Sequence, residues 1–144
     1  MMTGTCRRPR VRPFLSAIAH EPWRVGWSDC VGAMVRWIEA ETGLRATLLL
    51  PVAGDEAEAA ARLAEGGLLA CMTHGLDALG LVRTDRPQAG DVAHLRVVTG
   101  LLAGQESAAI HDGRHWLTIS RQSRLLPIRP AWCDATAWRL PHGL

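Results

Sequence analysis

The stretch Trp23-Arg24-Val25-Gly26-Trp27-Ser28-Asp29-Cys30 begins the clearest helix of this chain and determines how the rest is interpreted. The Ser28 hydroxyl can cap free backbone N–H groups, and Asp29 places negative charge beside the positive end of the helix dipole. The helix is predicted to end at Gly43. Its apolar residues recur at i, i+3, i+4 and i+7, which are Val31, Met34, Val35 and Ile38. We therefore expect one helix face to pack on a core, with Cys30 in the first turn.

The remainder of the sequence changes character near Pro87, with helical patterns before it and alternating patterns after it. Further helices are predicted from Asp55 to Glu65 and from Gly67 to Leu79. Strands are predicted over 91–98, 107–111, 115–119, 124–128 and 136–140. Asp112-Gly113 is typical of a tight turn, so the flanking strands should be antiparallel neighbours. The pattern predicts an α+β fold.

The length and the net charge of the chain limit the number of its domains and the kinds of partner that it can bind. A length of 144 residues predicts one domain, which we assign to residues 13–144, preceded by a basic arm over residues 1–12. The arm contains Arg7, Arg8, Arg10 and Arg12, and we expect it to be solvated or packed on a neighbour. A net charge of +2 is too small to indicate nucleic-acid binding, and no apolar run approaches the roughly 20 residues of a membrane span.

The four cysteines, Cys6, Cys30, Cys71 and Cys133, are too widely spaced for a zinc site, and we expect reduced thiols and no metal or other cofactor. Cys30 is different because of its place in a helix's first turn. Backbone N–H groups there stabilise a thiolate, so we expect Cys30 to be the most thiolate-like of the four, although Asp29 opposes this. The alternative is a small buried residue that only packs.

Several motifs together resemble the papain-like cell-wall peptidases of the NlpC type. They are Trp27-Ser28-Asp29-Cys30, which opens a helix and matches the nucleophile segment, and Gly90-Asp91-Val92, which opens a strand section. Gly66-Gly67-Leu68 and Ala137-Trp138-Arg139-Leu140 are similar to segments of a small branch found among phage and prophage tail genes. The resemblance covers Pro13 to Leu140. It implies a papain-like fold in which the cysteine-bearing helix packs against a C-terminal antiparallel sheet, with Cys30 at the nucleophile position.

The chain departs from that pattern at the position of the catalytic base. Active relatives carry a histidine at the start of the second sheet strand, whereas the matching position here falls on Ser107 or Val98. His111 lies on the strand face of Ser107 but about 13 Å further along, so pairing with Cys30 requires a register change. We name Cys30 and His111 as candidate catalytic residues on that condition. His94 and His111 otherwise suit hydrogen-bonded structural roles.

Two functions remain open from the sequence, and we favour the first. One is a tail-tip or tail-assembly structural component of a phage virion that has lost catalysis and binds other tail proteins through its tryptophans and arginine arm. The other is a cysteine peptidase that hydrolyses peptidoglycan stem peptides. A binding domain unrelated to phages is a third reading, because a fold does not fix a function.

Overall fold

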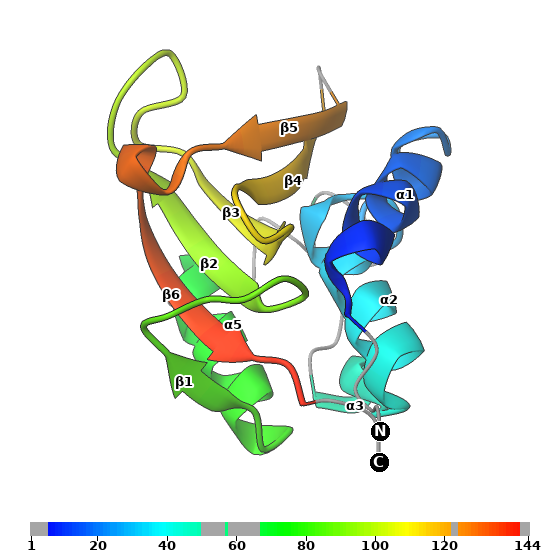
Figure 1. Ribbon diagram of the computed structural model, residues 1–144. Coiled ribbons are helices and arrows are strands. Elements are labelled where there is room, and N and C mark those ends of the chain that lie inside the picture. Colours follow the sequence, from blue (N-terminus) through cyan, green and yellow to red (C-terminus); the bar gives the residue numbers. More distant parts are fainter. Residues whose placement is uncertain (1–5, 50–56, 58–66, 122–123, 142–144) are drawn as a thin grey trace.

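A six-stranded antiparallel sheet forms the centre of the fold in the computed structural model, which describes residues 6–49, 57, 67–121 and 124–141. The strand order is β1-β6-β2-β3-β4-β5 (Figure 1). The strands are β1 (Val82–Thr84), β2 (Val92–Val97), β3 (Glu106–His111), β4 (Trp116–Ser120), β5 (Arg124–Ile128) and β6 (Cys133–Arg139). The last strand therefore lies between β1 and β2, beside the earliest strands of the sheet.

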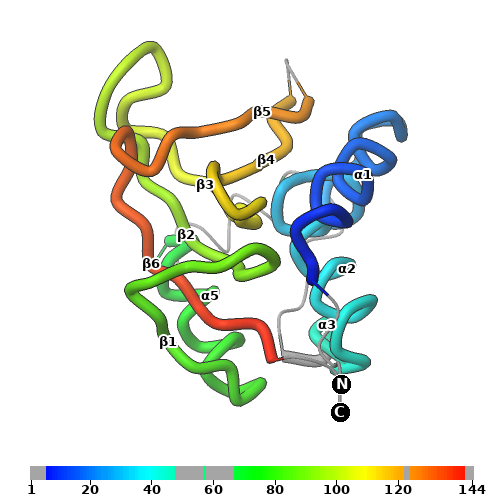
Figure 2. Tube along the Cα trace, in the orientation of Figure 1, coloured from blue at the N-terminus to red at the C-terminus, as the bar shows by residue number. Residues whose placement is uncertain are grey.

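The helices pack on one face of this sheet. They are α1 (Arg8–Ala19), α2 (Cys30–Thr42), α3 (Ala46–Leu49) and α5 (Gly67–Ala78), with a short 3-10 helix η1 (Pro130–Trp132) before β6. Figure 2 shows α1 and α2 beside β3, β4 and β5, whereas α5 lies beside β2 and β6. No helix among the described residues is long and apolar enough to cross a bilayer.

The sheet has a different core on each face. On the helix side, Met34 and Ile38 of α2 and Leu76 of α5 pack with Ile110 and Trp138. On the other side, the sheet buries Leu95, Ala109 and Trp116 against residues of β5 and the β2–β3 connection, and Figure 1 shows its strong curvature. Alternation along each strand therefore tells which face a side chain occupies.

The structure confirms the α+β class and most of the predicted elements. The strand predictions match β2 to β6 within a few residues, and β3 and β4 are antiparallel neighbours across Asp112-Gly113. The helix predicted from Gly67 is α5, and α2 ends before Gly43 in the left-handed conformation that favours glycine. The helix predicted from Asp55 to Glu65 lies outside the described residues apart from Ala57.

The predicted basic arm over residues 1–12 is wrong for its second half, because α1 begins at Arg8. Pro9 suits the first helical turn, where its missing N–H has no partner to lose. Val11, Leu15, Ile18 and Ala19 form a buried stripe against the sheet. The sequence does contain this apolar spacing, but the arginines between these residues led us to expect a solvated arm.

Arg7 is also not solvated, since only 4% of its surface is exposed. Its Nε donates to the Glu41 carboxylate at 3.0 Å, and its Nη1 donates to the Leu140 carbonyl at 2.9 Å. A further bond reaches the Pro141 carbonyl. Its side chain packs on Gly90, where any Cβ would lie 2.5 Å from the arginine Cδ. Arg7 is thus a structural residue of the domain.

Asp91 is the most connected buried carboxylate in the described part of the chain, with 1% of its surface exposed. Its oxygens accept the backbone N–H groups of Gln88 at 2.8 Å and Leu140 at 3.0 Å. The Arg139 guanidinium donates to it at 2.8 Å. One side chain therefore ties the entry of β2 to the end of β6.

We predict that Asp91→Ala lowers the free energy of unfolding by about 3 kcal/mol, because it strands two backbone donors and a guanidinium. Chemical denaturation monitored by tryptophan fluorescence measures this. Asp85→Ala, at an exposed position, is the control and should change stability by less than about 0.5 kcal/mol. Equal effects of the two variants would contradict the role of Asp91.

Candidate functional site

Cys30 is the first residue of α2, and the loop before it is held by Asp29 rather than by Ser28. Asp29 is the helix cap: its Oδ1 accepts the Gly32 N–H at 2.7 Å and its Oδ2 accepts the Gly26 N–H at 3.0 Å. The predicted cap at Ser28 is therefore wrong. The Ser28 hydroxyl is turned into the preceding loop, where it accepts from the Arg24 N–H and donates to the Pro22 carbonyl. Asp29 thus takes up donors that would otherwise favour a thiolate.

Gly32 explains how the loop lies so close to the helix. A Cβ at this position would lie 2.6 Å from the Trp27 nitrogen and 2.7 Å from the Gly26 carbonyl carbon. Both contacts are to backbone, which cannot rotate away. The helical pattern around Gly32 does not predict this contact, because a glycine inside such a pattern does not show what it touches.

The environment of Cys30 disfavours its ionised form. Desolvation by burial is the largest effect, and together with the Asp29 carboxylate it raises the pKa of the thiol to about 11. The backbone of Ala108 in β3 and of the first residues of α2 acts in the opposite direction but does not compensate. The expectation of an unusually acidic thiol is therefore wrong, because burial outweighs the helix start.

His111 and Cys30 lie on opposite faces of the sheet. Cys30 packs with the helix-side core, whereas the His111 ring makes an edge contact with Trp116 of the other core, with centroids 4.7 Å apart. His111 is 6% exposed, and burial lowers its pKa. Its Nδ1 accepts the Gly113 N–H at 3.0 Å, which is a structural role at the hairpin. The structure does not bring together the two residues that the sequence named as a candidate pair.

A different histidine, His94 of β2, lies on the Cys30 side of the sheet. His94 follows Val92 by two residues and so shares its helix-side face, and its register partner on β3 is Ala108, the residue whose backbone influences Cys30. The His94 Nε2 lies 2.6 Å from the Glu106 carboxylate. Only 4% of His94 is exposed. Within the described residues, no hydrogen bond joins the Cys30 sulfur to an imidazole.

From the sequence, we expected His94 to have a hydrogen-bonded structural role. The pairing of β2 with β3 determines its neighbours, since His94 faces Ala108 while Arg96 faces Glu106. The hairpin between the two strands is long and irregular, so spacing alone gives no register. The period-two pattern of β2 was the one available signal, because it places His94 on the face of Val92.

Of the six tryptophans, three are buried, two are exposed and one, Trp23, is half-buried. Trp37, Trp116 and Trp138 are at most 1% exposed, as expected of core anchors, and the Trp37 indole donates to the Gly90 carbonyl at 2.9 Å. Trp27 beside the start of α2 is 49% exposed, and Trp132 of η1 is 44% exposed. The Arg36 guanidinium stacks on Trp27 and the Arg129 guanidinium on Trp132. These two indoles are available to a partner.

We predict that Gly32→Ala destabilises the domain by about 3 kcal/mol, the upper part of the usual range for overpacking, because the new methyl group meets rigid backbone. Thermal and urea denaturation provide the measurement. Gly43→Ala is the matched control: it has open space but a φ of +74°, so it should cost only about 1 kcal/mol. Similar losses of unfolding free energy in the two variants would show that the loop can move away from the helix.

The labelling rate of Cys30 by iodoacetamide should be slow at neutral pH. A thiol with a pKa of about 11 is almost entirely protonated at pH 7, and the thiolate fraction rises about tenfold per pH unit up to the pKa. We expect exposed Cys6 and Cys71 to be labelled faster than Cys30 in the folded protein, as measured by peptide mass spectrometry. If Cys30 were labelled faster than Cys6 and Cys71 at pH 7, and if its labelling rate did not change with pH, the raised pKa would be contradicted.

The site therefore has the Cys30 thiol and the buried His94 imidazole on the same side of the sheet, with the exposed Glu106 carboxylate bonded to His94 and the exposed Trp27 indole before the start of α2. No group of three or more His, Cys, Asp or Glu side chains among the described residues is arranged to hold a metal ion. Comparisons with protein-family models, curated proteins and solved structures found no match to this chain.

Proposed function

We propose that this protein is a structural component of a phage tail tip or tail-assembly complex, built on an NlpC-type papain-like fold with degraded catalysis. The motifs from Trp27 to Cys30 and from Gly90 to Val92 carry the resemblance. Helix α2, which begins at Cys30 and packs on β3 and β4 of an antiparallel sheet, is compatible with that fold. Its partners would be other tail proteins, and its location the virion tail.

The surroundings of Cys30 are the observation that carries this proposal. A cysteine peptidase needs a thiolate for attack and a base for deacylation. Here burial raises the pKa of the thiol to about 11, and His111 lies on the other face of the sheet. Exposed Trp27 and Trp132, each with a stacked arginine, instead suit protein contacts, in which tryptophan and arginine are enriched.

A peptidase acting on peptidoglycan stem peptides is the second candidate function, and one observation favours it. The buried His94 imidazole is bonded to the exposed Glu106 carboxylate on the Cys30 side of the sheet. Such a pair holds an imidazole in a fixed orientation. If binding of a peptide drew the sulfur and His94 together, the three side chains would have the roles of nucleophile, base and orienting acid.

We expect purified protein to release no stem peptides from sacculi above the buffer background, as measured by chromatography and mass spectrometry. Cys30→Ser should leave the unfolding midpoint and incorporation into virions unchanged, because the thiol has no chemical role in this function. The protein should be detected as a component of purified virions from the phage or prophage that encodes it.

The same assay distinguishes the second candidate. Release of stem peptides that is abolished by Cys30→Ser would overturn the structural proposal. In that case, loss of release in His94→Ala but not in His111→Ala would assign the base to His94. The His111→Ala variant is the matched control, because His111 is equally buried in the same sheet but on the opposite face.

A further inference from the structure

Three arginines meet at the turn between β3 and β4. The Arg12 Nη2 lies 3.2 Å from the Asp112 Oδ2. Arg8, one helical turn earlier on α1, packs across Gly113, where any Cβ would lie 3.2 Å from both the Cδ and the Nε of the arginine. Arg114 is the next residue of the turn and is exposed. Arg8, Arg12 and Arg114 thus form one basic cluster.

The cluster is bonded to a single carboxylate within the described part of the chain, that of Asp112, and both oxygens of this carboxylate are occupied. Its Oδ1 accepts the backbone N–H groups of Arg114 at 2.8 Å and of His115 at 2.6 Å. Its Oδ2 accepts from Arg12. The guanidinium groups of Arg8 and Arg114 make no hydrogen bond or ion pair with any described residue. The cluster therefore keeps an excess of positive charge.

The positions of these arginines are unfavourable for the isolated domain. Arg8 and Arg12 are four residues apart on one helix, where like charges repel. Arg8 is also the first residue of α1, whose first turn has no acidic residue to offset the positive end of the helix dipole. Among the described residues, nothing compensates Arg8 or Arg114 for this cost. Such local conflicts are typical of functional sites, which indicates that the excess charge serves binding.

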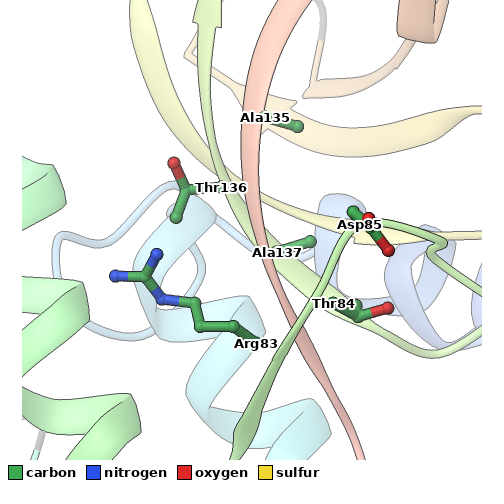
Figure 3. A pocket seen from close by; sticks show the side chains of 6 residues that line it. All are labelled: Arg83, Thr84, Asp85, Ala135, Thr136 and Ala137. Atoms are coloured by element: carbon green, nitrogen blue, oxygen red, sulfur yellow. The ribbon is translucent and has the colours of Figure 1, made fainter.

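Exposed arginines on the sheet have other surroundings. Arg83 lines a groove of about 610 Å³ between β1 and β6, which Asp85 also lines (Figure 3). The Arg83 guanidinium stacks over the Trp138 ring, 4.7 Å from its centroid. Arg96 of β2 lies 3.8 Å from the Glu106 carboxylate. These arginines are therefore stacked or lie beside a carboxylate, whereas the basic cluster has three guanidinium groups and one carboxylate.

Two observations favour a protein over nucleic acid or a lipid surface as the partner. Proteins that bind a duplex commonly neutralise about six to ten phosphates, whereas the net charge of this chain is +2 and the cluster has three cations. Binding to a lipid surface combines basic residues with inserted apolar side chains. The large apolar side chains exposed in the described residues lie outside α1 and the turn, and they are Trp27, Leu69, Val82, Val98, Leu101 and Trp132.

We propose that the basic cluster binds an acidic segment of a partner protein. Arg8 and Arg114 each pair with an aspartate or glutamate side chain, since a carboxylate accepts two parallel N–H groups from a guanidinium. Arg12, which Asp112 holds, adds to the local positive potential. The identity of the partner as a tail protein rests on the proposed function, whereas the acidic character of the bound segment does not.

The probe is a blocked, fluorescently labelled peptide of alternating glutamate and glycine, and its counterpart has lysine in place of glutamate. In anisotropy titrations at low ionic strength, the glutamate peptide should bind and the lysine peptide should not. Arg8→Gln/Arg114→Gln should weaken binding of the glutamate peptide about fivefold, as expected for two exposed ion pairs. Backbone amide NMR should show shifts at residues 8–12 and 112–115.

Arg45→Gln/Arg83→Gln is the matched control, because it removes the same net charge at two exposed arginines outside the cluster. It should change the affinity by less than about twofold, since distant exposed charges are screened. Amide spectra report whether both double variants keep their fold. If Arg8→Gln/Arg114→Gln does not, Arg114→Gln alone, in the exposed turn, gives the test and should weaken binding about twofold.

Equal losses of affinity in the two double variants would overturn the proposal, because general charge attraction would then explain the binding. So would failure of the glutamate peptide to bind. Tighter binding of a short DNA duplex, or of vesicles containing phosphatidylglycerol, that depends on Arg8 and Arg114 would also overturn it. These outcomes do not bear on the tail assignment, which depends on the sacculus and virion experiments.

Discussion

The buried Asp91 carboxylate is the interaction on which the architecture depends. It binds the Gln88 N–H, the Leu140 N–H and the Arg139 guanidinium, so it fixes where β2 begins relative to where β6 ends. Next to it, the Gly90 carbonyl accepts the Trp37 indole of α2. The orientation of α2 on the sheet, and with it the position of Cys30 near β3, thus follows from one turn of the chain at residues 88–91.

The elements with strong periodicity were predictable from sequence, and the others were not. The apolar spacing from Val31 to Ile38 and the alternation along the strands gave α2 and most of the sheet correctly. Helix α1 was overlooked because its arginines suggested a solvated arm. Strand β1 has three residues and is exposed or half-exposed throughout, so it carries no alternation that could identify it.

The candidate site was predictable in its composition but not in its geometry. The sequence indicated Cys30 at a helix start, which the structure confirms. It gave no means of weighing the helix dipole against burial, and burial decides the pKa of this thiol. The choice between His94 and His111 depends on which face of the sheet each occupies relative to α2, and that relation exists only after strands and helices have packed.

The buried guanidinium of Arg7 has a consequence for the order in which the domain can form during translation. Besides the Glu41 carboxylate, its acceptors are the carbonyls of Leu140 and Pro141, more than a hundred positions further along the chain. These two carbonyl bonds cannot form until β6 has been synthesised, so the guanidinium stays partly hydrated until then, and β6 has to insert between β1 and β2. Closure of such sequence-distant contacts is slow, so the Arg7 contacts and the insertion of β6 are expected to be late steps of folding.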